Sequence, residues 1–255
     1  MADFQVLFDN FDLNSIGYLE FSRRFPNVEA SYELVTHDLI RRAGAVLTSV
    51  KHGQKVITLK GHIIAPTRIA YEEALDELKF RTSSIQRNLV INQAGANRVY
   101  VATKESITEE HLEAGKSNIE LAFRCADPYG RSETLENSSE VVTTTPGALA
   151  VYFSGTAEVL PVFTITFNSL TGGTTKYVGI GNSTTGQQVQ VTRTWTAGDV
   201  LRVDTDLKRI YVNGVLSDYS GVFPVFAPYS ETSYYYDNLT TRNVTVEVSY
   251  AKQYL

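Results

Sequence analysis

Hydrophobic and polar positions alternate with a period of about two along most of the chain, which is typical of half-buried β-strands. In the first half the alternation occupies several short runs that are rich in β-branched and aromatic residues. We expect a strand in each of these runs: Phe4 to Leu7, Tyr18 to Phe21, Ala30 to Val35, Val56 to Ile64, Leu89 to Ile91, Arg98 to Thr103 and Ile119 to Phe123.

One segment of the first half has a helical period instead. Within residues 67–84 the side chains of Tyr71, Ala74, Leu75 and Leu78 are spaced i, i+3, i+4 and i+7, which places them on one face of an α-helix. The sequence therefore predicts a single amphipathic helix between the strands of this half.

From Leu149 onward no helical period occurs, and short runs are separated by turns that contain Gly, Asn or Asp. Asn213-Gly214 is the sharpest turn signal, because a type I′ turn needs positive φ at both central residues. We expect a hairpin from Asp204 to Leu216 and a β-sandwich overall. The expected strands are Val151 to Phe153, Val162 to Phe167, Lys176 to Ile180, Gln188 to Thr192, Val200 to Val203, Arg209 to Val212 and Val244 to Tyr250.

The fold class predicted from these patterns is mainly β, with an N-terminal β-sandwich-like domain that contains one helix and a C-terminal β-sandwich. Between them, residues 131–147 are rich in Ser and Thr and poor in bulky side chains, which is typical of a connector. We expect domains at 1–130 and 148–255.

The composition of the chain limits the classes of partner that it can bind. The net charge is -5, from 23 basic and 28 acidic residues, so we expect no recognition of nucleic acid and no attraction to an anionic membrane. No apolar run is long enough to insert into a bilayer. The single cysteine, Cys125, excludes an intrachain disulfide. The acidic start of the chain does not resemble a secretory signal, and we expect folding in the cytoplasm.

Candidate catalytic and metal patterns are incomplete. The run from Asn10 to Asn14 has the alternating oxygen ligands of a calcium loop, but Ser15 and Phe21 stand where that loop needs glycine and glutamate. His37-Asp38 has no Gly-x-Ser-x-Gly turn to accompany it. Gly179-Ile180-Gly181 has no helix behind it, and we interpret it as a turn between strands. We therefore expect no enzyme, no cofactor and no metal site.

Two groups of side chains are candidates for contact with partners. Trp195 and the run Tyr234-Tyr235-Tyr236 could stack on sugars, since alternation leaves either Tyr235, or Tyr234 with Tyr236, exposed on a strand. We take Trp195 and Tyr235 as the candidate carbohydrate contact; the alternative is that the single tryptophan packs in the core of the sandwich, as most such residues do. A polar, basic stretch around Gly44 and Gly53 is expected to form an exposed hairpin arm. It contains Arg41, Arg42, Lys51, His52 and Lys55.

The segment from Leu121 to Tyr129 resembles the signature of the siphophage distal tail protein family, Dit, in which an apolar strand runs into Cys-x-Asp-Pro-Tyr. Pro128 cannot continue a central strand and Asp127 favours a turn, so we interpret Cys125, Asp127, Pro128 and Tyr129 as a domain-boundary motif. Further segments are similar to the family's C-terminal galectin-like sandwich: Gly155 to Phe163, Gly198 to Asp204, Arg209 to Gly214 and Gly221 to Phe226.

The resemblance implies a structural virion protein, a homohexameric ring that joins the tail tube to the baseplate hub. Its implied partners are other copies of itself, the tail tube protein, the baseplate hub or tail-associated protein, and receptor-binding or tail fibre proteins. Its implied location is the virion tail, with assembly in the cytoplasm of the host bacterium. In this reading the basic arm contacts the neighbouring copy. The alternative is a carbohydrate-binding module that touches the host cell surface through the C-terminal sandwich.

Overall fold

The computed structural model describes residues 5–22, 30–38, 45–93, 96–149, 151–229 and 233–255, and for 30–38 and 45–51 it describes the backbone alone. The chain divides into two compact units, residues 1–131 (unit 1) and residues 132–254 (unit 2). The mainly β fold class is confirmed, and within the described ranges α1 is the one α-helix.

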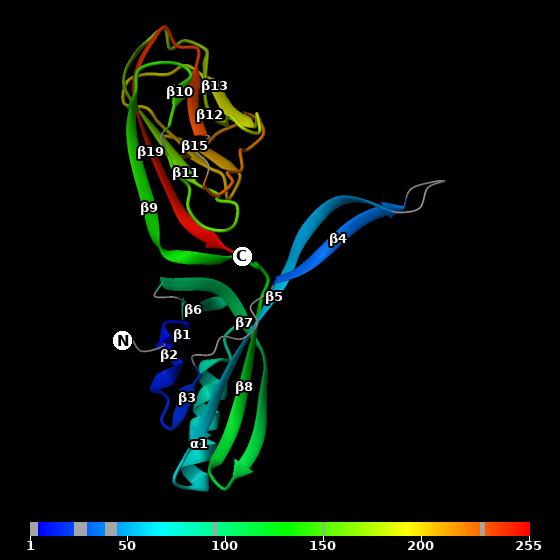
Figure 1. Cartoon of the computed structure of the whole chain (residues 1–255). Coiled ribbons are helices and arrows are strands. Elements are labelled where there is room, and N and C mark those ends of the chain that lie inside the picture. Colours follow the sequence, from blue (N-terminus) through cyan, green and yellow to red (C-terminus); the bar gives the residue numbers. More distant parts are fainter. Residues whose placement is uncertain (1–4, 23–29, 39–44, 94–95, 150, 230–232) are drawn as a thin grey trace. The chain divides into compact units, whose positions relative to one another are not determined.

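Unit 1 combines antiparallel strands with this helix (Figure 1). Its elements are β1 (Val6–Phe8), β2 (Phe11–Asp12), the 3-10 turn η1 (Leu13–Ser15), β3 (Leu19–Phe21), β4 (Ala30–Asp38), β5 (Ala45–Ile64), α1 (Arg68–Arg81), β6 (Arg87–Gln93), β7 (Ala96–Glu113) and β8 (Lys116–Cys125). β8 lies between β5 and β7, and the pairing continues from β7 through β6 and β1 to β2. β3 and β4 both pair with β5.

The helix forms where its period predicts. Thr67 caps its start, with the side-chain oxygen accepting a hydrogen bond from the backbone N of Ala70 at 3.2 Å. The four residues of the predicted apolar face are all buried in the core of unit 1. The helix is four residues shorter than the predicted range of 67–84: Thr67 is its cap, and Thr82 already leaves the helical conformation.

Unit 2 consists of two antiparallel sheets. Its elements are β9 (Gly130–Val142), β10 (Gly147–Ala148), β11 (Val162–Thr171), β12 (Lys176–Asn182), β13 (Gln188–Arg193), β14 (Val200–Asp204), β15 (Arg209–Val212), β16 (Val215–Leu216), β17 (Ser220–Gly221), β18 (Ser233–Asp237) and β19 (Thr241–Tyr254). One sheet has the order β16-β15-β14-β11-β19-β9 and the other β10-β18-β12-β13-β17.

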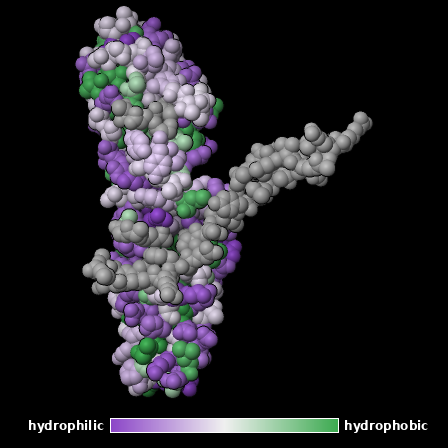
Figure 2. All heavy atoms as spheres, in the orientation of Figure 1, coloured by the Kyte–Doolittle hydropathy of each residue, from purple (hydrophilic) through white to green (hydrophobic). Residues whose placement is uncertain are grey.

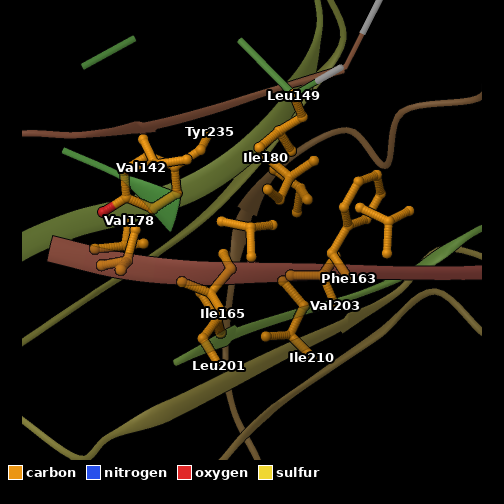
Figure 3. Close-up of a cluster of buried hydrophobic side chains, with 14 of the residues drawn as sticks. Val142, Leu149, Phe163, Ile165, Val178, Ile180, Leu201, Val203, Ile210 and Tyr235 are labelled. Atoms are coloured by element: carbon orange, nitrogen blue, oxygen red, sulfur yellow. The ribbon is translucent and has the colours of Figure 1, made fainter. Parts of the chain in front are cut away.

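The two sheets of unit 2 enclose one hydrophobic core, to which alternate residues of the longer inner strands contribute (Figure 3). Phe163 and Ile165 enter it from β11, and Val178 and Ile180 from β12. The predicted hairpin is present, with Asn213 at φ 52° and Gly214 at φ 79° between β15 and β16.

On the visible face, hydrophilic side chains surround small groups of apolar ones (Figure 2).

Three local predictions differ from the structure. Residues 131–147, predicted as a connector, include most of β9. Because most side chains of this strand are exposed, its sequence is polar and resembles that of a connector. Val151 to Phe153 is predicted as a strand but lies outside the strands, although both end residues are buried in the core. Gly179 and Gly181 lie inside β12 rather than in a turn, because tyrosine rings of β18 cover them.

Candidate functional site

The domain-boundary motif ends β8. Cys125 is the last residue of the strand and is fully buried, and burial raises the pKa of its thiol to about 12. Two residues on, the Asp127 carboxylate accepts a hydrogen bond from the backbone N of Tyr129 at 3.0 Å, which turns the chain. Pro128 has no N–H to continue a ladder. The motif therefore terminates a strand and leaves no reactive thiol.

The predicted arm residues Lys55 and His52 lie against this motif. Lys55 pairs directly with Cys125 across β5 and β8, is 0% exposed, and holds its Nζ 5.2 Å from the centre of the Tyr100 ring. The ring of His52 lies 5.8 Å from that of Tyr129. Placing Lys55 on an exposed arm is wrong, because strand alternation turns it to the core side of β5; burial accordingly lowers the pKa of Lys55.

Sequence reasoning missed Tyr100 and Gly130 at this junction. A Cβ added to Gly130 would lie 2.6 Å from the Cζ atom of Tyr100, so the buried tyrosine ring fits only against glycine. The sequence separation of 30 residues between them gives no local signal. The end of unit 1 is thus tightly packed and structural.

One further residue of the predicted arm, Lys51, lies in the paired strands β4 and β5. Arg41 and Arg42 lie outside the described residues, and Lys51 is placed by its backbone, opposite Glu33 of β4. From 45 to 51, β5 has β4 as its sole hydrogen-bonded neighbour among the described strands, and the two form a ribbon that continues past the sheet (Figure 1). Such a ribbon presents two backbone edges that another chain can pair with.

The candidate carbohydrate contact through Trp195 and Tyr235 is wrong. Trp195 is 2% exposed, stacks on Phe167 at 4.9 Å, and donates its Nε1–H to the carbonyl of Lys176 at 2.8 Å. Tyr235 is 0% exposed and donates its hydroxyl to the carboxylate of Asp237. Neither ring can stack on a sugar. The same strand alternation that buries Tyr235 leaves Tyr234 and Tyr236 half-buried on the outer face.

Within the described ranges, no group of three or more His, Cys, Asp or Glu side chains is placed to hold a metal ion. In the run that resembles a calcium loop, Asp12 caps η1 and accepts a hydrogen bond from the backbone N of Asn14 at 3.0 Å. None of the described helices is both long and apolar enough to cross a membrane.

Comparison with known proteins adds a family and a fold. Residues 154–254 match the family model of the siphovirus-type tail component, C-terminal domain. The chain is similar to the Dit protein (gp 19.1) of phage SPP1, with a TM-score of 0.72, 18% identity and coverage of 99% of each chain. It is also similar to a chain of the phage P2 baseplate in its activated conformation with Ca, with a TM-score of 0.44, 10% identity and coverage of 99% and 98%. No curated protein matches.

Proposed function

We propose that this chain, whose residues 154–254 belong to the siphovirus-type tail component family, forms a hexameric ring that joins the tail tube to the baseplate hub of a phage. The predicted resemblance to the distal tail proteins is confirmed by this match, and the fold is that of Dit. The chain is accordingly a structural component of a phage tail.

A single observation carries the proposal: the likeness to SPP1 Dit covers 99% of both chains. That protein is described as a paradigm of the hub adsorption apparatus in phages that infect Gram-positive bacteria. Because a likeness over the whole length includes both units, we propose the same position here, with the tail tube protein on one side and the hub or tail-associated protein on the other. Receptor-binding or tail fibre proteins would dock at its periphery.

Ring closure requires one interface that repeats around the ring, in which a surface of each copy meets a different surface of the next. The β4–β5 ribbon supports such an interface, since its backbone edges can pair with a neighbouring copy. Arg41, Arg42 and Lys51 of the predicted arm are basic, and a neighbouring copy of this chain has a net charge of -5. The C-terminal galectin-like domain would then project outward.

Electron microscopy of the purified full-length chain tests this proposal. We expect class averages of a closed ring with six-fold symmetry. A ring with another number of copies, or isolated particles of one or two copies at every concentration, would overturn the hexamer while leaving the family assignment intact.

A further inference from the structure

Two tyrosine rings on the outer face of the five-stranded sheet of unit 2 lie over glycines of the neighbouring strand. In the pairing of β18 with β12, Tyr236 stands opposite Gly179 and Tyr234 opposite Gly181. A Cβ added to Gly179 would lie 2.7 Å from the Oη atom of Tyr236, and one added to Gly181 would collide with the Tyr234 ring. Each ring therefore lies along the sheet, with one face against glycine backbone.

The opposite faces of these rings form an aromatic platform in which neighbouring rings are tilted, by 48° between Tyr234 and Tyr236 and by 47° between Tyr177 and Tyr236. The ring centres of Tyr234 and Tyr236 are 5.7 Å apart, and Tyr177 lies 5.9 Å beyond Tyr236. The hydroxyl of Tyr234 reaches across β12 to donate to the side-chain oxygen of Gln188, at 3.3 Å. All three rings are half-buried, as expected for rings that keep one face in solvent. Exposed Gln188 and half-buried Gln190 border the platform on β13.

A hollow of about 690 Å³ adjoins the platform at Tyr234. Pro146 and Ala148 contribute apolar surface to it, and Glu140 and Ser183 contribute polar groups. This volume falls within the roughly 300–1,000 Å³ of small-molecule sites, which combine apolar walls with a few polar groups.

The composition of platform and hollow selects a ligand class. Aromatic rings stack on the apolar C–H faces of pyranose sugars, while the adjoining carboxylate and amide groups can hydrogen-bond sugar hydroxyls. Glu140 is the one acidic or basic side chain among the described residues that line the hollow. Its negative charge disfavours a phosphate-bearing polymer. The chemistry that remains is that of an uncharged sugar.

We propose that unit 2 binds a neutral oligosaccharide, with one pyranose ring stacked on Tyr234, beside Tyr236, and its hydroxyl groups hydrogen-bonded to Gln188 and Glu140. The site uses neither Trp195 nor Tyr235, which face the core. It is a binding activity additional to the ring and does not depend on ring formation.

An array of neutral bacterial-surface oligosaccharides, with poly(glycerol phosphate) as the anionic probe, tests the proposal on the full-length chain. We expect saturable binding to at least one neutral oligosaccharide and none to the phosphate polymer. Tyr234→Ala should weaken that binding roughly tenfold, because it removes a stacking contact. The matched control is Tyr211→Ala, which removes a half-buried strand tyrosine of the other sheet and should leave binding unchanged.

Loss of the ring could also loosen the sheet around Gly181, so the fold of Tyr234→Ala is checked by near-ultraviolet circular dichroism. Tyr234→Phe keeps the ring and should retain binding, and Glu140→Gln should weaken binding without disturbing the platform. The proposal is overturned by a wild-type chain that binds no neutral oligosaccharide, by binding to poly(glycerol phosphate) alone, or by equal binding of Tyr234→Ala and Tyr211→Ala. None of these results bears on the hexamer.

Discussion

Asp237 is the buried charge on which the polar interior of unit 2 depends. Its side chain is 0% exposed and pairs with Arg242, which is 12% exposed, at 2.9 Å. The same carboxylate accepts hydrogen bonds from the hydroxyl of Tyr235 and from the backbone N of Leu239. Burial raises the pKa of Tyr235, so that this hydroxyl stays protonated and remains a donor.

Asp237→Ala should lower the free energy of unfolding of unit 2 by about 3–5 kcal/mol, because it leaves the buried guanidinium of Arg242 without its counter-charge. Urea unfolding followed by the fluorescence of Trp195, the single tryptophan, measures this change. Glu136→Ala is the control. It breaks an ion pair between Glu136, whose side chain is 44% exposed, and Lys252, whose side chain is 31% exposed. This variant should lower the free energy of unfolding by about 1 kcal/mol or less. Equal losses in both variants would contradict this role of Asp237.

Cys125 should resist thiol reagents in the folded protein. Burial holds its pKa at about 12, so at pH 8 the thiol is protonated and also shielded from solvent, and only the thiolate reacts. We expect no labelling by a disulfide reagent at pH 8 in native buffer and complete labelling in urea. Rapid labelling of the native chain would show that the junction around the domain-boundary motif opens readily.

At the scale of elements, Gly214 in the turn between β15 and β16 allows the free energy of a left-handed backbone conformation to be measured separately from side-chain contacts. Gly214 has φ 79° and nothing within 4 Å of an added Cβ, so Gly214→Ala changes the backbone energy alone. We expect a loss of about 1–2 kcal/mol in the free energy of unfolding. Gly17→Ala has the same open surroundings without a positive φ, and should not destabilise the chain. Thermal unfolding by circular dichroism compares the two, and similar shifts would refute this explanation.

The basic arm is tested by reversing its charge. The double variant Arg41→Glu with Arg42→Glu should reduce the fraction of chain in the ring, because the arm would then meet a neighbour of like charge. Light scattering measures that fraction. Lys208→Glu with Arg209→Glu is the control, since it makes the same change in net charge at two exposed residues of unit 2, the last residue of a turn and the first residue of β15. Unchanged assembly in the arm variant would remove the arm from the interface.

Periodicity predicted those elements that have one buried face. The face of α1 and the Asn213-Gly214 hairpin could be read directly, because each follows from local spacing or turn chemistry. β9 could not, since most of its side chains are exposed and its Ser-rich composition matches that of a connector. A single basic residue such as Lys55 was assigned to solvent by residue type, although the alternation of β5 places it on the core side.

For the candidate carbohydrate contact, the sequence could not determine which face of β18 is buried. Alternation establishes that Tyr235 and its two neighbours point to opposite faces of β18, but the choice of the inner face depends on the partner strand. That choice is made by Gly179 and Gly181, whose bare backbone accepts the rings of Tyr236 and Tyr234. The pairing joins residues more than 50 positions apart, which no short window of sequence contains.

At the scale of the whole molecule, we propose that function resides in contacts between copies of this chain and with other tail proteins. Catalytic and metal patterns in the sequence are incomplete, and the side chains around the domain-boundary motif serve packing. We propose that the N-terminal unit closes the ring and that the C-terminal unit presents its sheets to partners.

The mass of the full-length chain in solution, measured by native mass spectrometry over a range of concentrations, tests the hexameric ring most directly. If the ring is a hexamer, we expect a species of about 170 kDa, six times the 28.3 kDa of one chain. A single species of 28.3 kDa at every concentration, or an assembly of any number of copies other than six, would contradict it.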